Sequence, residues 1–439
     1  MRTRRCGVVA VLGMAGLWMA PAGLSAQAVG NVRARVASAM AGRGFSSARL
    51  ARLDTMLEDA VRREEIAGAV ALVLRDDGIV YERAVGWADR EQQRPMRPDA
   101  IFRIASQTKA ITSAAVLMLL EEGKFMLGTP ASRFLPSFAQ TTVAQRTDTG
   151  VAIVPARRAI TIKDLLTHTA GISYGTDSHV AARYEAAGLG PAAGQGWYTA
   201  DKTEPICTSM DRLGTLPFVA QPGEAYVYGY NTDILGCIVE RASGVPLDAF
   251  LGTRLFDPLG MPDTRFFLPE SARDRLVTVY RSDAGRAVRA PEGPKGQGQY
   301  VDGPRMSFAG GAGLVSTARD YARFLQMIAH GGEWAGRRYL APHTVALMRT
   351  NQVGPLRGPG VGFGLGFETV EQYGVTGMLT PGTFGWAGAY GTNYKIDPVE
   401  GLILVFMINQ MPTSSDIVTR FQTLVYGALE ETRWPLMRR

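Results

Sequence analysis

The sequence has little cysteine, little histidine and no long apolar run. Three Cys and four His occur among 439 residues, and none falls into a C-x-x-C or H-E-x-x-H spacing, which argues against a zinc site. No G-x-G-x-x-G or G-x-x-x-x-G-K-[ST] loop is present either, which argues against nucleotide chemistry. We therefore expect no cofactor. Beyond the N-terminus no stretch approaches the roughly 20 apolar residues that a membrane span needs.

The first 28 residues have the pattern of a secretory signal peptide. Three Arg stand within the first five residues, an apolar run covers residues 7–20, and small residues end the segment at Ala26-x-Ala28. We predict cleavage near Ala28 and a secreted or periplasmic protein. Removing three Arg and no acid lowers the formal net charge from +7 to +4, and the remaining charges are interspersed. No nucleic-acid partner is expected.

Two cysteines remain after removal of the signal segment, which takes Cys6 with it. Cys207 and Cys237 can in principle pair in an exported protein, but spacing does not show whether the geometry allows it. Cys237 falls in the apolar, helix-like run 233–242. A buried free thiol is the interpretation that the sequence favours.

The remaining composition is that of a globular enzyme, with 46% hydrophobic and 20% charged residues. Strand patterns gather at the two ends of the chain, whereas the middle, 124–291, shows helical pieces and loops. This order predicts an α/β fold of the α+β type, with an antiparallel sheet flanked by helices and built from both chain ends. We expect an α/β lobe at about 29–105 and 300–439, and an inserted, mostly helical lobe at about 106–299. The expected helices are 47–64, 110–122, 162–167, 232–242 and 416–429, and the expected strands are 69–74, 79–84, 313–316, 362–368, 391–396 and 402–409.

Ser106 and Lys109 stand three residues apart at the start of the helix expected at 110–122, so their side chains share one face. A serine hydroxyl needs a base to become a nucleophile, and a lysine buried among apolar neighbours holds its proton less tightly. The helix N-terminus adds backbone N–H groups that can stabilise an oxyanion. The pair therefore predicts covalent catalysis, although S-x-x-K alone is a weak signal.

Four further segments follow residues 101–109 along the chain in a fixed order, and they make the signal from Ser106 and Lys109 more specific. The five segments are 101–109 (IFRIASQTK), 165–171 (LLTHTAG), 222–236 (PGEAYVYGYNTDILG), 313–321 (GLVSTARDY) and 407–412 (MINQMP). Together they resemble the serine β-lactamase and penicillin-binding protein superfamily, most closely the class C β-lactamase-related esterases called family VIII carboxylesterases. The resemblance covers most of the mature chain and implies a β-lactamase/transpeptidase-like fold.

The second motif of this family supplies a general-base tyrosine, which the resemblance places at Tyr228. Tyr230 and Asn231 follow as candidate substrate contacts, but Asn231 stands one place too late for a strict Y-x-N, and Gly229 replaces the usual Ser. A purely structural interpretation is that these tyrosines pack inward. His168 is expected to be a hydrogen-bonding residue of its turn.

The third motif of the family resembles Trp386-Ala387-Gly388-Ala389, the W-x-G form of the esterase branch. The resemblance implies that the backbone N–H groups of Ser106 and Ala389 form the oxyanion hole, and that Trp386 and Gly388 line the substrate site. Trp386 stands where β-lactamases carry the Lys that grips a carboxylate. This favours neutral esters over anionic β-lactams.

A competing nucleophile is Ser173, because residues 171–175 (GISYG) fit the G-x-S-x-G of α/β-hydrolases. That motif requires a strand before it and a helix after it, and neither is indicated here. We therefore expect Ser106 to be the nucleophile.

These residues predict an exported serine hydrolase that cleaves small carboxylic esters through an acyl-enzyme. Three alternatives stay open on the same scaffold: a β-lactamase or D-amino-acid peptidase or amidase, an acyltransferase, and a non-catalytic binding protein for cell-wall peptides. The expected partner is a small ester or β-lactam-like substrate, and the oligomeric state is left open. Segments 141–159 and 174–208 show few firm elements and are expected to overhang the site and shape substrate choice.

Overall fold

The computed structural model describes residues 44–148, 150–190, 200–293 and 296–435. The signal peptide predicted for residues 1–28 lies outside these residues. Within the described part of the chain, no helix combines the length and the apolar character needed to cross a membrane.

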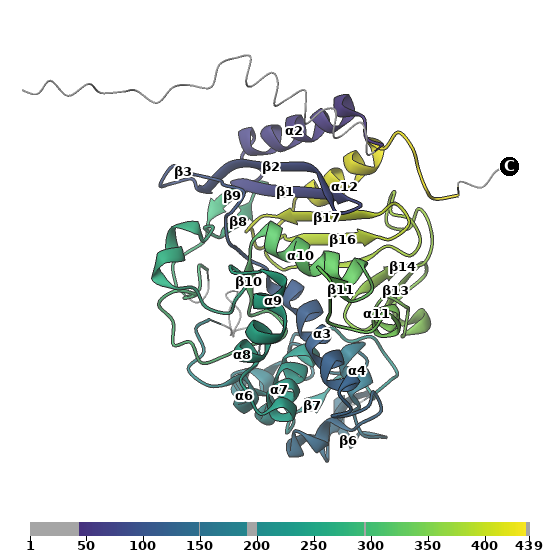
Figure 1. The fold of residues 1–439 in the computed structure, drawn as a ribbon. Helices are drawn as coiled ribbons and strands as arrows, with labels where there is room; N and C mark the ends of the chain where they lie inside the picture. Colours follow the sequence, from purple (N-terminus) through teal and green to yellow (C-terminus); the bar gives the residue numbers. More distant parts are fainter. Residues whose placement is uncertain (1–43, 149, 191–199, 294–295, 436–439) are drawn as a thin grey trace, which may run out of the picture.

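Strands from both chain ends form one antiparallel sheet, as predicted (Figure 1). The order is β13-β14-β15-β16-β17-β1-β2-β3, so the first strand of the chain pairs directly with the last. The turn between β1 and β2 uses Asp76 and Asp77 at positive φ, which Asp tolerates better than most residues. The strands are β1 (Gly68–Arg75), β2 (Gly78–Asp89), β3 (Arg94–Pro95), β13 (Val361–Phe363), β14 (Glu368–Val370), β15 (Phe384–Ala387), β16 (Asn393–Asp397) and β17 (Leu402–Met407).

Helices cover both faces of the sheet (Figure 1), and for this reason all eight residues of β1 are buried. Alternate residues of β1 belong to two apolar clusters. One cluster contains residues of α2 and α12, and the other contains residues of α3 and α10. The described helices are α2 (Ser47–Arg62), α3 (Thr108–Glu121), α4 (Ile162–Leu166), α5 (Ala181–Ala186), α6 (Ile206–Leu213), α7 (Asn231–Ser243), α8 (Leu247–Leu251), α9 (Asp257–Leu259), α10 (Ala318–Ala329), α11 (Pro342–Met348) and α12 (Ile417–Gly427).

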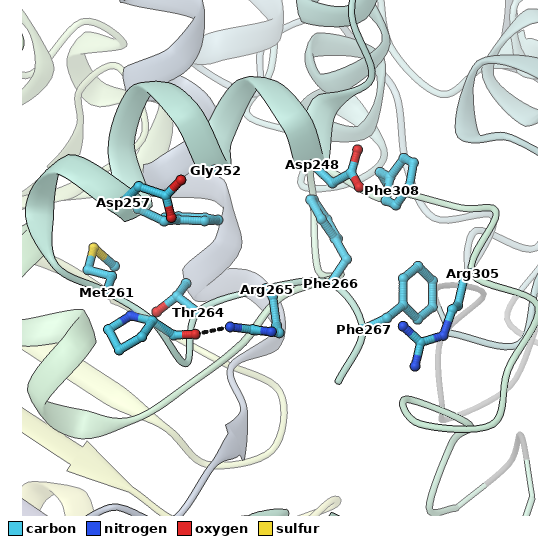
Figure 2. A pocket seen from close by; sticks show the side chains of 12 residues that line it. Asp248, Gly252, Asp257, Met261, Thr264, Arg265, Phe266, Phe267, Arg305 and Phe308 are labelled. Carbon is cyan, nitrogen blue, oxygen red and sulfur yellow. Dashed lines mark hydrogen bonds between the residues drawn. The ribbon is translucent and has the colours of Figure 1, made fainter. Parts of the chain in front are cut away.

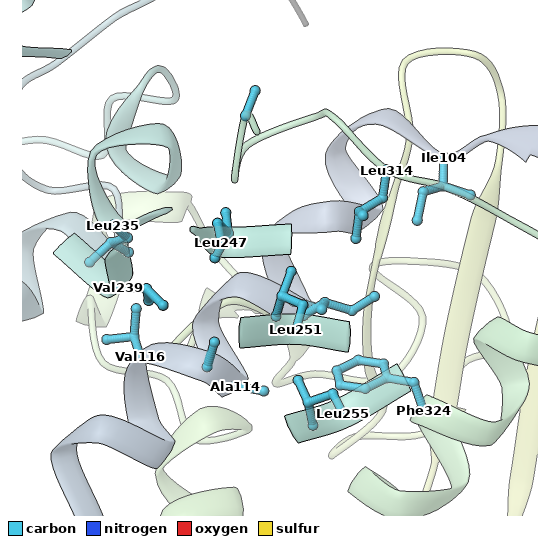
Figure 3. Close-up of a cluster of buried hydrophobic side chains, with 14 of the residues drawn as sticks. Ile104, Ala114, Val116, Leu235, Val239, Leu247, Leu251, Leu255, Leu314 and Phe324 are labelled. Carbon is cyan, nitrogen blue, oxygen red and sulfur yellow. The ribbon is translucent and has the colours of Figure 1, made fainter. Parts of the chain in front are cut away.

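Helix α3 runs through the centre of the molecule. Its residues 108–119 are all buried, as expected for a helix that is apolar on every side. Figure 3 shows part of the cluster around it, in which Ala114 and Val116 of α3 lie among side chains of α7 and α8. The same cluster includes β1, so α3 joins the sheet to the inserted helices.

The inserted part of the chain contains more strand than the sequence predicts. Segment 141–159 was expected to have few firm elements, and this is wrong. It forms the hairpin of β5 (Thr142–Thr147) and β6 (Gly150–Pro155), with β5 also pairing in parallel with β7 (Pro217–Phe218). Val, Ile and Thr suit such strands, but here they are mixed with Ala, Gln and Arg in two short runs that show no clear alternation. The remaining described strands are β4 (Phe102–Arg103), β8 (Tyr280–Asp283), β9 (Arg286–Arg289), β10 (Val315–Ser316), β11 (Glu333–Trp334) and β12 (Arg337–Arg338).

Cys207 and Cys237 form a disulfide that joins α6 to α7. The interpretation of Cys237 as a buried free thiol is therefore wrong. The sulfur of Cys237 is buried, as expected. Its partner, Cys207, lies on a helix 30 residues earlier in the chain, and only the packing of α6 on α7 brings the two sulfurs together.

Candidate active site

The proposed nucleophile lies on a tight turn that leads from β4 into α3. Ala105, directly before Ser106, has φ +41°, an uncommon backbone conformation for a residue with a side chain. The turn is fixed by a hydrogen bond from the Ile104 N–H to the Leu314 carbonyl and by the Tyr321 hydroxyl, which donates to the Gln107 carbonyl at 2.8 Å. Ser106 itself stays partly exposed at the N-terminal end of α3.

Lys109 is buried, with 2% of its surface exposed, and its amine lies 3.2 Å from the Ser106 hydroxyl oxygen. The same Nζ donates to the Tyr174 hydroxyl at 2.9 Å and to the Gly311 carbonyl at 2.7 Å. A neutral amine has two N–H groups and one lone pair. In the ammonium form Nζ donates to the Ser106 oxygen as well. In the neutral form, with Tyr174 and Gly311 accepting the two N–H groups, the lone pair faces Ser106, the orientation that a general base requires.

Tyr228 lies beside this pair, with its ring centroid 4.7 Å from Lys109 Nζ. Its hydroxyl accepts a hydrogen bond of 3.1 Å from Trp386 Nε1. The structure thus brings Ser106, Lys109, Tyr228 and Trp386 into one cluster. The single donor of the indole is directed at Tyr228.

His168 supports the turn that carries Tyr228, whereas the sequence predicted only a hydrogen-bonding role in its own turn. Its carbonyl accepts the Val227 N–H at 2.7 Å, and its ring centroid lies 4.7 Å from that of Tyr228. Burial, together with the charges of Lys109 and Arg357, lowers the pKa of His168 well below its usual range. The imidazole is therefore neutral at physiological pH.

Gly388 follows β15 and lies against the nucleophile turn. A Cβ at this position would come within 2.3 Å of the Ile104 carbonyl oxygen, so only glycine allows this approach. Because Gly388 contacts this turn, the next residue, Ala389, lies close to the turn that carries Ser106. The predicted oxyanion role of the Ala389 N–H stays a prediction.

Tyr230 and Asn231 occupy buried positions at the start of α7. The Tyr230 hydroxyl donates to the Leu189 carbonyl at 2.8 Å, and the Asn231 amide lies 2.9 Å from His168 Nδ1. Both side chains have structural partners, and Asn231 is completely buried. The chemistry proposed below does not use them as substrate contacts.

Tyr174 is the site residue that sequence reasoning missed. It lies inside the G-x-S-x-G pattern, one residue after Ser173, whose hydroxyl is buried and accepts the Gly175 N–H. As predicted, neither a strand nor a helix borders residues 171–175. The G-x-S-x-G pattern therefore points to Ser173, whereas the residue that contacts Lys109 is Tyr174.

Comparison with known proteins identifies the family of this chain. A family model described as Beta-lactamase matches residues 53–427. The chain belongs to the beta-lactamase family. It is a serine hydrolase of that family, with the mixed α/β fold that the resemblance implies.

Related members of the beta-lactamase family include named esterases. The chain is 34% identical over 378 residues to esterase EstB of Burkholderia gladioli, covering 82% of this chain and 90% of that protein. It is 36% identical over 373 residues to protein Rv1367c of Mycobacterium tuberculosis, covering 80% and 87%. Among solved structures it resembles EstCE1, described as a hydrolase with promiscuous acyltransferase activity, with a TM-score of 0.72, 26% identity and coverage of 87% and 98%.

A cation lies beside the third motif of this family member although the motif itself has no lysine. The Arg357 guanidinium carbon lies 5.5 Å from the Trp386 ring centroid and 4.7 Å from that of Tyr226. Arg357 pairs with Glu368, which also pairs with Lys395 at 3.2 Å. The two cations Arg357 and Lys395 therefore share the one carboxylate of Glu368.

A separate cavity of about 350 Å³ lies along α8 and α9 and does not include the catalytic cluster. Figure 2 shows Phe266, Phe267 and Phe308 on one side of it, with Arg305 next to Phe267. Arg265 donates to the Pro262 carbonyl at its rim. No candidate catalytic residue lines this cavity.

Proposed function

We propose that this protein is an exported hydrolase of small carboxylic esters that works through an acyl-enzyme on Ser106. The observation that carries the proposal is the Lys109 amine, held 3.2 Å from the Ser106 oxygen by two other acceptors. The name of the relative EstB, an esterase, supports the choice of substrate class.

In the acylation step Lys109 takes the Ser106 proton while Oγ bonds to the ester carbonyl carbon. The carbonyl electron pair moves to the oxygen, where the N–H groups of Ser106 and Ala389 stabilise it. When the intermediate collapses, the C–O bond to the alcohol breaks and the alcohol leaves with a proton from the ammonium of Lys109, with Tyr228 sharing the acid/base work.

In the deacylation step a water molecule attacks the acyl carbon and gives its proton to the same acid/base pair. The bond between the acyl carbon and Oγ then breaks, the carboxylic acid leaves, and Ser106 recovers its proton. An alcohol that replaces water at this step gives acyl transfer instead of hydrolysis.

Two purified variants test the nucleophile. Ser106→Ala is expected to abolish hydrolysis of p-nitrophenyl butyrate and labelling by a fluorophosphonate probe, whereas Ser173→Ala keeps both. Full activity in Ser106→Ala, with loss in Ser173→Ala, would overturn the assignment. A wild-type protein that the probe does not label would point to the non-catalytic binding protein.

β-Lactams are the second candidate substrates, and Arg357 is the observation that favours them. Its charge lies near the place where β-lactamases hold a carboxylate, although Glu368 offsets part of it. We expect neutral esters to be preferred. Faster turnover of nitrocefin than of p-nitrophenyl butyrate, lost in Arg357→Gln, would reverse that preference.

Export follows from the signal-like segment at residues 1–28. Expression in a bacterial host with fractionation and N-terminal sequencing tests it. We expect the mature chain outside the cytoplasm, beginning near Gln27 to Val29. An uncleaved cytoplasmic chain would contradict the export part of the proposal alone.

A further inference from the structure

Asp233, in the first turn of α7, is a buried carboxylate that the mechanism above does not use. None of its surface is exposed. One oxygen, Oδ1, accepts the Gly311 N–H at 3.0 Å, and the other, Oδ2, has no hydrogen-bond partner among the described residues. A buried charge with an unpartnered oxygen is costly for a fold. Such a group calls for a functional explanation.

Gly311 connects this carboxylate to the proposed general base. Its N–H donates to Asp233, and its carbonyl accepts the N–H of Lys109 at 2.7 Å. A Cβ at residue 311 would lie 2.3 Å from Asp233 Oδ2, so the contact needs glycine. A single residue, Gly311, therefore links the Asp233 carboxylate to the Lys109 amine.

The neighbouring Gly310 is fixed between the same two helices. Its carbonyl accepts the Thr112 hydroxyl of α3 at 2.8 Å, and a Cβ on it would lie 2.7 Å from the Thr232 carbonyl of α7. The Gly310–Gly311 segment is thus held on both sides, which makes the distance between Asp233 and Lys109 a fixed property of the fold.

Few titratable groups share this region. Lys109 on α3 and Tyr230, just before α7, interact electrostatically with Asp233. Around Lys109 itself lie the hydroxyl of Tyr174, the ring of Tyr228 and the neutral His168. Burial raises the pKa of Asp233 to about 6, with the charge of Lys109 and the Gly311 N–H opposing the rise. The carboxyl is consequently ionised at neutral pH.

We propose that Asp233 is a positioning residue for Lys109, holding Gly311 in place and stabilising the ammonium that Lys109 becomes when it takes the Ser106 proton. The inference rests on the proposed function, in which Lys109 is the base. Positive charge develops on Lys109 in the transition state, and a fixed negative charge in a buried site stabilises it there. Replacing Asp233 by a neutral residue is therefore expected to weaken the ammonium form of Lys109 relative to the free amine.

The test is the pH profile of kcat/KM for p-nitrophenyl butyrate in Asp233→Asn, which keeps an oxygen for the Gly311 N–H and loses the charge. We expect kcat to fall about tenfold or more at the plateau. We also expect the acid limb to move to lower pH by about one unit, because the ammonium is no longer favoured. A purely structural residue lowers activity at every pH and leaves the limb where it was.

Asp320→Asn is the matched control. Asp320 is also a buried carboxylate in the first turn of a helix, and its pKa is also raised by burial. It accepts the Asp263 N–H and the Thr264 hydroxyl, and neither of these described partners belongs to the catalytic cluster. Its variant is expected to keep the wild-type limb. An unmoved limb in Asp233→Asn, whatever its activity, overturns the proposal, as does an equal movement in Asp320→Asn.

Asp233→Ser serves if Asp233→Asn does not fold, and the same shift of the limb is expected. If the wild type hydrolyses no ester, the proposed function fails, but the inference is still testable. The rate at which a fluorophosphonate labels Ser106 then replaces kcat/KM, because labelling needs the same proton transfer and no ester substrate.

Discussion

At the scale of single residues, Tyr174 orients the Lys109 amine toward Ser106. Its hydroxyl accepts one of the amine's N–H groups at 2.9 Å. Tyr174→Phe removes the acceptor and keeps the ring. We expect kcat to fall about tenfold, the equivalent of one hydrogen bond of about 1.4 kcal/mol, with little change in KM. Steady-state kinetics with p-nitrophenyl butyrate measures both values.

The neighbouring Ser173→Ala is the control for this variant. Ser173 lies in the same loop and is buried, whereas Tyr174 is partly buried, and among the described residues the Ser173 hydroxyl accepts the Gly175 N–H within the loop. It is expected to keep wild-type kcat. A Tyr174→Phe variant that loses no more activity than Ser173→Ala would show that Tyr174 does not orient the base.

Asp233 also makes the stability of the fold depend on pH. Its folded pKa, about 6, lies above the ordinary value of 3.8, so the folded state binds this proton more tightly than the unfolded state. The stabilisation of the fold that Asp233 contributes is therefore fully present below about pH 4, and it is lost as the pH rises through 6. The shift corresponds to about 3 kcal/mol.

Urea unfolding of the wild type and of Asp233→Asn across pH 4 to 8 checks this dependence. We expect the free energy of unfolding of the variant, relative to the wild type, to rise over this range. A constant difference between the two proteins would mean that the carboxyl does not titrate there.

At the scale of elements, the residue after β15 packs closely against the turn that carries Ser106. Gly388→Ala puts a methyl group 2.3 Å from the Ile104 carbonyl, and this forces the two segments apart. A displacement of this kind costs roughly a hundredfold in kcat/KM. Gly427→Ala at the end of α12, where a methyl group meets nothing within 4 Å, is the control and is expected to stay fully active. Equal activity in both variants would argue against a close fit at β15.

The disulfide between α6 and α7 closes a loop of 30 residues in sequence separation. Cross-linking a loop of this length stabilises a fold by about 3 to 4 kcal/mol in the chain-entropy model. We expect dithiothreitol to lower the urea midpoint of the wild type and to leave the midpoint of the Cys207→Ala/Cys237→Ala variant unchanged. An equal response of the two proteins would mean that the bond does not stabilise the fold.

At the scale of the whole molecule, the sheet was predictable because its signals are local. Asp76-Asp77-Gly78 between two apolar runs indicates a hairpin, and the run 402–409 indicates a buried strand. The single strand predicted at 362–368 is instead the end of β13, a turn and the start of β14, because alternation does not show where a strand turns back.

The candidate site was predictable only where its residues lie in ordered motifs. Ser106, Lys109, Tyr228 and Trp386 came from such segments. Asp233 lies inside the 222–236 motif and Tyr174 inside the 171–175 pattern, but spacing does not show that either is near Lys109, because those contacts join distant parts of the chain. For the same reason the spacing of Cys207 and Cys237 did not show whether the two cysteines pair.

The last strand of the chain, β17, lies between β16 and β1 in the middle of the sheet. Its alternate residues enter both apolar clusters, so both layers of helices depend on it. A chain ending at residue 400 lacks β17 and α12. We expect it to show no cooperative urea unfolding, no near-UV circular dichroism and no labelling by the fluorophosphonate. A chain ending at residue 435 keeps every described element and should retain all three. A cooperative transition in the shorter chain would mean that the remaining strands and helices form a fold without β17, contrary to its place between β16 and β1 in the sheet.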